Sequence, residues 1–174
     1  MDDEFEQIFK RWFDEHKRLL FRIVRIYASS LDEQDDLFQE ILLHLWKSVP
    51  NFKGLAKETT WIYRVALNTA LLWRRSRRRR RKRFRKSIIN FEDIPASPAD
   101  SSSAQENHKL FDQLYKAIRQ LPVIDSCVVL MHLEGLGYED MTKVLGISKN
   151  HVGVRLNRAK KALARDLKGL LDEI

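Results

Sequence analysis

Apolar residues recur every three or four positions along nearly the whole chain, and this helical periodicity is broken only once, between residues 88 and 106. The segments that carry the pattern are rich in Leu, Glu, Lys, Arg and Ala, and alternating runs of Val, Ile and Thr are almost absent. With 6 Gly and 4 Pro in 174 residues, few positions can end a helix. The sequence therefore predicts an all-α fold.

The break divides the chain into two helical domains. Residues 88–106 contain two prolines, a run of serines and four acidic residues, and no Lys or Arg. Such a composition is typical of a flexible linker. We therefore expect a first small helical domain at residues 1–87, an acidic linker at 88–106 and a second helical domain at 107–174.

The composition also excludes some classes of protein. A hydrophobic content of 44% with 10% aromatic residues is enough to bury one ordinary core or two small ones. The single Cys127 lies in an apolar run, so we expect a buried thiol in a reducing, cytoplasmic protein. No segment approaches the roughly 18 uncharged apolar residues that cross a bilayer, so we expect no membrane insertion.

In the first domain, the spacing of apolar residues from Phe5 to Tyr27 predicts one long helix or two short ones. Ser30 and Glu33 form a candidate capping box that opens the next helix. One face of that helix is an apolar stripe made of Leu37, Phe38, Ile41, Leu42, Leu45 and Trp46. The opposite face carries Asp36, Gln39 and Glu40, which by themselves indicate an ordinary solvated surface.

A strongly basic run follows the third predicted helix. Pro50 and Gly54 mark a loop, after which a helix begins near Thr60 and meets no breaker before the run. Eleven of the thirteen residues from Arg74 to Lys86 are Lys or Arg. Since the net charge of the whole chain is +8, the other 161 residues have a net charge of −3. We expect the run to continue the helix and, unless an anion is bound, to fray from about Arg79, because like charges on neighbouring turns repel.

Aromatic, polar and cationic residues gather around the start of this helix. Phe52, Lys53 and Gly54 lie in the loop, and Trp61, Arg64 and Asn68 follow at helical spacing. Single-stranded nucleic acid is bound by such a combination of stacking and cationic side chains. A tryptophan is more often a core residue, so this alternative stays open for Trp61.

The second domain contains a candidate helix-turn-helix. The segment YEDMTKVL, a turn at Gly146 and an N-cap at Ser148 precede the second helix. That helix places Val152, Leu156, Ala159 and Leu163 on one face, and Asn150, Val154, Asn157, Arg158 and Lys161 on the other. Amides and arginines can contact base edges. A helical hairpin with a solvated basic face is the alternative.

No pattern in the sequence indicates catalysis. The five histidines show no metal-ligand spacing, and neither a Gly-rich phosphate loop nor a Ser/His/Asp arrangement occurs. We therefore expect no enzyme activity, no metal and no cofactor.

Taken together, the motifs resemble the extracytoplasmic-function sigma factors of the sigma-70 family, which are initiation subunits of bacterial RNA polymerase. The resemblance covers nearly the whole chain and rests on four blocks in order. These are DEQDDLFQEILLHLW, NFKG followed by TTWIYRVALNTA, the LP that opens the second domain, and GLGYEDMTKVLGIS followed by VRLNRAKKAL.

The resemblance implies a function and a role for each surface. A sigma factor binds core polymerase, directs it to promoters through the minus-ten and minus-thirty-five elements and assists melting; an anti-sigma protein often restrains it. Core polymerase binding is implied for Asp36, Gln39 and Glu40. Contacts to the minus-ten element, as duplex and melted strand, are implied for Phe52, Lys53, Gly54, Trp61, Arg64, Asn68, Arg74, Arg75, Arg77 and Arg78. Contacts to the minus-thirty-five duplex are implied for Lys149, Asn150, His151, Val154, Arg155, Asn157, Arg158 and Lys161.

The linker at 88–106 is expected, by the same resemblance, to run toward the polymerase active centre, where its acids mimic nucleic acid. In the recognition helix His151, Gly153 and Val154 depart from the residues common in the family. Two other functions fit parts of the sequence. A stand-alone helix-turn-helix regulator leaves the loop at Phe52 and the acidic linker without a role, and an arginine-rich RNA-binding protein leaves the recognition-helix face without one.

Overall fold

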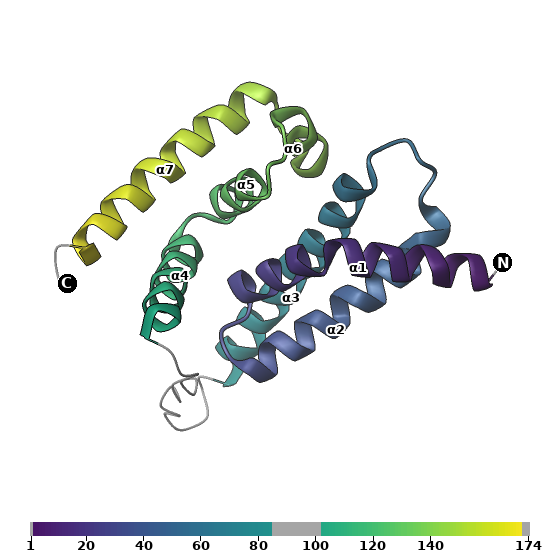
Figure 1. The fold of residues 1–174 in the computed structure, drawn as a ribbon, viewed down its shortest axis with the longest axis horizontal. Helices are drawn as coiled ribbons and strands as arrows, with labels where there is room; N and C mark the ends of the chain where they lie inside the picture. The colour runs from purple at the N-terminus through teal and green to yellow at the C-terminus, as the bar shows by residue number, and fades with distance from the viewer. Residues whose placement is uncertain (1, 85–101, 172–174) are drawn as a thin grey trace.

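A computed structural model describes residues 2–84 and 102–171, and every regular element in these ranges is a helix. The elements are α1 (Asp2–Tyr27), α2 (Leu31–Ser48), a short 3-10 helix η1 (Val49–Asn51), α3 (Glu58–Phe84), α4 (Ser102–Gln120), α5 (Val123–Leu133), α6 (Tyr138–Leu145) and α7 (Lys149–Leu171). Figure 1 shows α1, α2 and α3 as one group, with α4 to α7 arching beside it. The predicted all-α class is confirmed.

The first group is a three-helix bundle. The apolar spacing that allowed one or two helices before Tyr27 produces a single helix, α1. Side chains from all three helices interdigitate in its core, among them Leu20, Ile23, Leu37, Ile41, Ile62 and Leu67. Each is at most 2% exposed, and full burial of one such side chain contributes about 1.5–3 kcal/mol.

Hydrogen bonds at the start of α2 confirm the predicted capping box. The Ser30 hydroxyl accepts from the Glu33 backbone N–H at 3.3 Å, and the Glu33 carboxylate accepts from the Ser30 N–H at 3.4 Å and the Ser29 N–H at 2.7 Å. These bonds satisfy backbone donors that have no partner inside the helix. The helix axis of α2 is therefore defined from its first turn.

The third helix runs without interruption into the basic run. It begins at Glu58 and continues through Phe84, so the run does extend the helix. The structure keeps helix beyond Arg79, where like-charge repulsion was expected to fray it. Arginine has a high intrinsic helix propensity, which offsets part of that repulsion. The rest of the run and most of the predicted linker lie outside the described residues, and α4 begins at Ser102, inside the segment 88–106.

The helix-turn-helix in the second group has the predicted local structure. Pro122 precedes α5, and α6 ends at Gly146, whose φ of 67° is the left-handed conformation that glycine adopts without strain. The Ser148 hydroxyl then accepts from the His151 N–H at 3.3 Å and caps α7. The apolar faces of α5, α6 and α7 are buried, with Met131, Met141 and Val152 fully inside the core.

The two groups pack against each other, which sequence alone left open. Tyr27 at the end of α1 lies within 3.0 Å of the Cys127 sulfur and 3.4 Å of the Ser126 hydroxyl oxygen, both on α5. Ion pairs join Arg22 to Glu134 and, at 3.0 Å, Lys57 to Asp140. The buried apolar residues of the two groups thus form one continuous core. A further pair joins Arg25 of α1 to Asp112 of α4.

Burial of this contact changes the chemistry of its polar groups. Desolvation raises the pKa of the Cys127 thiol and, together with the neighbouring Cys127, raises the pKa of Tyr27 well above its ordinary value. The prediction that the Cys127 thiol is buried is confirmed. In the described ranges, no helix combines the length and the apolar character that crossing a membrane requires.

Candidate nucleic-acid and partner-binding surfaces

An exposed polar face lies along α2. Asp36, Gln39 and Glu40 are all exposed, because Leu37 and Ile41 on the opposite side are fully buried against α1 and α3. The three side chains therefore point away from the bundle, where a partner can reach them.

Apolar side chains lie beside this polar face, and sequence reasoning missed them. Leu43 is 50% exposed and Trp46 is 40% exposed. Trp46 was assigned to the apolar stripe, but it sits at the edge of the bundle with its ring edge-on to Phe9 at 5.4 Å. A polar face bordered by exposed apolar groups is typical of a protein–protein interface.

The loop before α3 is held by three aromatic rings. Phe52 packs edge-on against the buried Trp12 at 5.3 Å and against Trp61 at 5.7 Å. The Trp61 indole N–H donates to the Ser48 hydroxyl at 3.2 Å. Phe52 and Trp61 are thus partly buried supports of the loop, with only part of each ring open to a ligand.

The tip of the same loop is exposed. Lys53 and Gly54 face solvent, and Gly54 has a φ of 69°, which turns the chain. Leu55, which the sequence interpretation did not single out, is 91% exposed. An apolar side chain next to a turn glycine was the available signal.

Arg64 and Asn68 lie one turn apart on the exposed side of α3, as their spacing predicted. Their neighbours Tyr63, Ala66 and Leu67 are buried and fix the orientation of the helix. The structure therefore presents both polar side chains on one accessible face.

The described arginines of the basic run divide between two directions. Arg75 is exposed. Arg74 instead lies over the Tyr27 ring, with its guanidinium carbon 5.6 Å from the ring centre, and Arg77 forms an ion pair with Glu33 of α2. The side chain of Arg78 lies outside the described residues.

The recognition helix α7 has the predicted two faces. Val152, Leu156, Ala159 and Leu163 are buried. Lys149, Asn150, His151, Val154, Asn157, Arg158 and Lys161 are exposed. The exposed set combines amides and cations with the 42% exposed Val154, groups that can contact base edges, phosphates and a thymine methyl.

Two positions of α7 differ from a plain exposed face. Arg155 is partly buried, and its guanidinium donates to the carboxylate of Asp125 on α5 at 2.8 Å. Gly153 faces α6, and a Cβ there would meet the Tyr138 ring at 3.6 Å, an ordinary contact distance. A side chain at position 153 would therefore contact α6.

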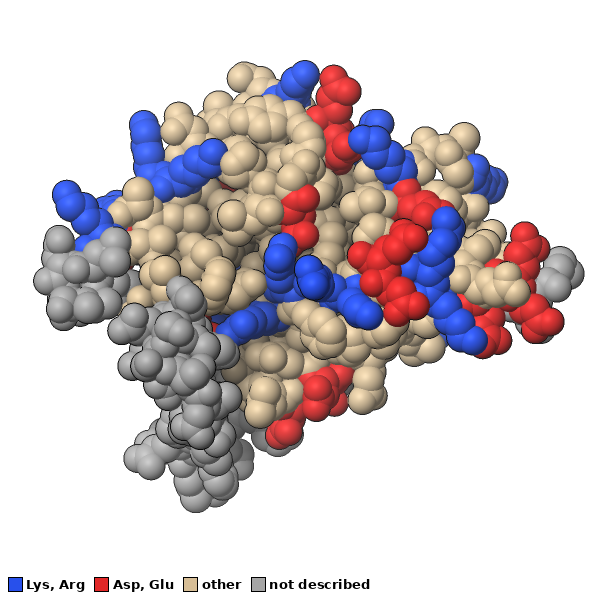
Figure 2. All heavy atoms as spheres, viewed as in Figure 1, with Lys and Arg blue, Asp and Glu red and all other residues tan. Residues whose placement is uncertain are grey.

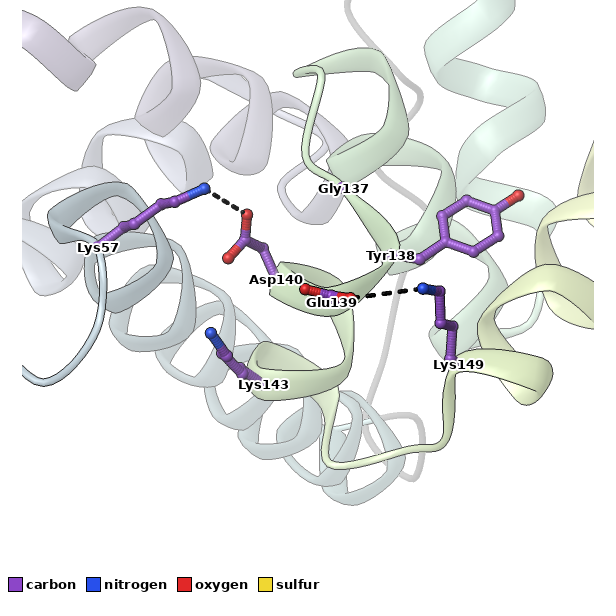
Figure 3. Close-up of a pocket in the computed structure, with 7 residues that line it drawn as sticks. All are labelled: Lys57, Gly137, Tyr138, Glu139, Asp140, Lys143 and Lys149. Carbon is purple, nitrogen blue, oxygen red and sulfur yellow. Dashed lines mark hydrogen bonds and ion pairs between the residues drawn. The ribbon is translucent and has the colours of Figure 1, made fainter.

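A pocket of about 380 Å³ opens where α6 approaches the start of α3 (Figure 3). Two of its lysines form ion pairs: Lys57 with Asp140 at 3.0 Å and Lys149 with Glu139 at 3.5 Å. Lys143 also lines it. These groups form no nucleophile–base pair, and no cluster of His, Cys, Asp and Glu fit to hold a metal occurs within residues 2–84 and 102–171.

Positive and negative side chains alternate on the face drawn in Figure 2. Lys and Arg gather near the middle of this face, and acidic residues gather toward the end where the N-terminus lies. This face therefore carries charges of both signs, in contrast to the run Arg74–Lys86, where the charged residues are all Lys or Arg.

Comparison with known proteins gives the family context of these surfaces. The family model described as Sigma-70 region 2 matches residues 12–80, and the model described as Sigma-70, region 4 matches residues 111–163. The chain is 31% identical to the RNA polymerase sigma-H factor of Pseudomonas aeruginosa, over 94% of this chain and 90% of that protein. It is 27% identical to the ECF RNA polymerase sigma-E factor of Escherichia coli K12, over 86% and 81% of the two chains.

Two solved structures share the fold. One is CnrH in complex with the cytosolic domain of CnrY, with a TM-score of 0.66, 17% identity and coverage of 94% of this chain and 90% of that chain. The other is the sigma factor RpoE in complex with the anti-sigma factor NepR from Bartonella quintana, with a TM-score of 0.68, 21% identity and coverage of 91% and 98%.

Proposed function

The chain belongs to the sigma-70 family, in its extracytoplasmic-function group, and we propose how its exposed surfaces divide the work of transcription initiation. As a sigma factor it binds core RNA polymerase, directs the enzyme to promoters through the minus-ten and minus-thirty-five elements and assists promoter melting. The family consists of initiation factors rather than enzymes.

The polymerase-binding surface is the exposed face of α2. Asp36, Gln39 and Glu40 supply its polar contacts, and the adjacent Leu43 and Trp46 supply apolar area. Apolar anchors beside charged groups give both affinity and a defined orientation. Residues 1–87 form the domain that binds polymerase and the minus-ten element.

The minus-ten element is held by the loop and by α3. Lys53, Gly54, Arg64 and Asn68 contact the strand from exposed positions, while Phe52 and Trp61 support the loop and expose part of their rings. Extruding a base costs a few kcal/mol of unstacking, which stacking and cationic contacts offset. Arg75 extends this track along the backbone, and Arg74, Arg77 and Arg78 belong to the same basic run.

The minus-thirty-five element is bound by α7 within a second domain at residues 107–174. The observation that carries this assignment is the division of α7: its predicted packing residues are buried, and its predicted DNA-facing residues are exposed, apart from the partly buried Arg155. Asn150, Asn157 and Arg158 contact base edges, and Lys149 and Lys161 contact phosphates. His151 and Val154 complete the face.

An anti-sigma protein is a further proposed partner. One structural relative is CnrH in complex with the cytosolic domain of CnrY, and another is the sigma factor RpoE in complex with the anti-sigma factor NepR. The same fold in this chain supports a similar regulation. Because core RNA polymerase is its partner, we place the protein in the cytoplasm.

Transcription in vitro with purified core polymerase and a library of promoter fragments tests the assignment. Adding the protein is expected to create new start sites. Binding to duplex DNA or RNA without any new start site would instead support the helix-turn-helix regulator or the RNA-binding protein.

The polymerase surface is tested by charge reversal. The double variant Asp36→Lys and Glu40→Lys is expected to weaken binding to core polymerase and to leave binding of minus-thirty-five duplex unchanged. The double variant Asp14→Lys and Glu15→Lys makes the same charge change at exposed positions of α1 and serves as control. Equal losses for both variants, or losses in both assays, contradict the assignment.

A further inference from the structure

Arg77 is only partly exposed, with 38% of its side chain accessible, whereas Arg75 in the same helical turn is exposed. Its guanidinium forms an ion pair with the Glu33 carboxylate and lies over the Trp73 ring, 5.1 Å from the ring centre. The side chain of Glu33, to which Arg77 is paired, is only 7% exposed. A carboxylate sheltered to this degree needs a cation or several hydrogen bonds close by.

Glu33 is the residue that fixes the first turn of α2. One carboxylate oxygen, Oε2, accepts from the backbone N–H groups of Ser29 and Ser30, and the other, Oε1, meets Arg77. Arg77 thereby braces the capping carboxylate from the side opposite to the backbone. Any change in the position of Glu33 moves the first turn of the helix with it.

The braced turn directly precedes the polymerase-binding face. Asp36 follows Glu33 by three residues, or nearly one helical turn. Gln39 and Glu40 lie on the next turn of the same helix. Arg74, which shares a helix face with Arg77, lies over the Tyr27 ring at the end of α1. The start of the basic run is therefore packed on the corner between α1 and α2.

We propose that Arg77 is a positioning residue for polymerase binding, which acts by holding Glu33 and the first turn of α2, while Arg75 faces DNA phosphates. The basic run thus joins the DNA-binding helix to the polymerase-binding helix within one domain. This inference rests on the proposed function of the Asp36–Glu40 face.

A matched pair of variants separates the two roles in the full chain. Arg77→Met and Arg75→Met remove the same charge from the same turn of α3. We expect Arg77→Met to weaken binding to core polymerase about tenfold, within the range of measured couplings between contacting residues, and to leave the salt dependence of promoter binding unchanged. Arg75→Met should leave polymerase affinity unchanged and lower the slope of log K against log salt by about 1.

The conservative variant and a double-mutant cycle exclude a general loss of folding. Arg77→Lys keeps a cation beside Glu33 and should recover part of the polymerase affinity. Glu33→Gln should reproduce the loss, and combining it with Arg77→Met should add little, because both changes remove the Arg77–Glu33 ion pair. If the losses of polymerase-binding free energy in the two single variants simply add in the double variant, Arg77 does not act through Glu33.

Two outcomes overturn the inference in distinguishable ways. If Arg77→Met lowers the salt slope as Arg75→Met does and spares polymerase binding, Arg77 is a phosphate contact. If the reversal at Asp36 and Glu40 also spares polymerase binding, the proposed docking face fails as well. A loss on that reversal, without a loss in Arg77→Met, rejects only the positioning role.

Discussion

The contact between the two halves is predicted to open when its charges are neutralised. Among the described residues, three ion pairs join the two helix groups, and each has its cation in the first group and its acid in the second: Arg22–Glu134, Arg25–Asp112 and Lys57–Asp140. The variant Asp112→Asn, Glu134→Gln and Asp140→Asn removes all three pairs with little change in side-chain shape. We expect it to shift the protein toward an open form.

The expected magnitude follows from the exposure of each pair. Glu134 and Asp140 are sheltered, with side chains 14% and 16% exposed, but Arg22 and Lys57 are 43% and 75% exposed. Solvent-exposed pairs contribute about 0.2–1 kcal/mol each, so the three together stabilise the packed form by about 0.6–3 kcal/mol. Removing them should raise the open population relative to the packed one by about 3- to 150-fold.

Single-molecule energy transfer between α1 and α7 measures this equilibrium. The substitutions Glu15→Cys and Lys160→Cys place dyes at exposed positions. The native Cys127 lies in the contact that is expected to open, so every labelled variant also carries Cys127→Ala. Raising the salt concentration should act in the same direction as the substitutions, because it screens exposed pairs.

A control variant changes the same number of acids elsewhere. Asp14, Glu139 and Asp166 form their ion pairs within one helix group, so Asp14→Asn, Glu139→Gln and Asp166→Asn should leave the packed form as it is. Equal opening in both variants, or none in either, would show that the apolar contact around Tyr27 and Cys127 holds the halves together and that the ion pairs do not.

Four further predictions concern stability. The Tyr63 hydroxyl is buried and has no hydrogen-bond partner among the described residues, so Tyr63→Phe should raise the free energy of unfolding by about 1 kcal/mol; Tyr27→Phe, which removes the contacts to α5, should lower it by about the same amount in denaturant titrations. Burial raises the pKa of Cys127 above its unperturbed 9.0, and it raises the pKa of Tyr27 and of Tyr63 above their unperturbed 10.0. As the pH rises, these groups therefore ionise first in the unfolded state, so the free energy of unfolding is full below about pH 9 and falls above it, by up to about 1.4 kcal/mol per pH unit for each group. Thermal melts across alkaline pH measure this loss. Gly153→Ala should raise stability by about 0.5–1 kcal/mol in the same melts and leave minus-thirty-five affinity in a binding titration unchanged, since the added methyl fits inside the domain; a loss of affinity would show that Gly153 permits close approach to DNA.

The sequence predicted most of the local structure because local rules determine it. The capping box at Ser30 and Glu33, the turn at Gly146 and the cap at Ser148 each depend on neighbours within four residues. The two faces of α7 follow from helical spacing alone.

The sequence could not predict which polar residues pair across the fold. Arg155 lies close to the exposed face of α7 by spacing, yet it reaches Asp125 on a helix distant in sequence. Tyr27 has the same periodicity as the core of its own domain, yet it contacts Ser126 and Cys127 in the other. Such pairings depend on how whole helices pack against one another, and the spacing of residues along one helix does not predict that packing.

The basic run illustrates the same limit on a single helix. Its arginines are chemically identical, but successive residues on a helix point about 100° apart, so Arg74 and Arg77 share one face and Arg75 occupies another. The inward face meets a tyrosine ring and a buried carboxylate, contacts that the planar guanidinium makes better than an ammonium group. Replacing the described arginines by lysine would keep the charge available to DNA and weaken the packing on α1 and α2. The basic run, which the sequence shows only as a concentration of positive charge, therefore also packs against α1 and α2. Arginine suits both DNA binding and this packing better than lysine does.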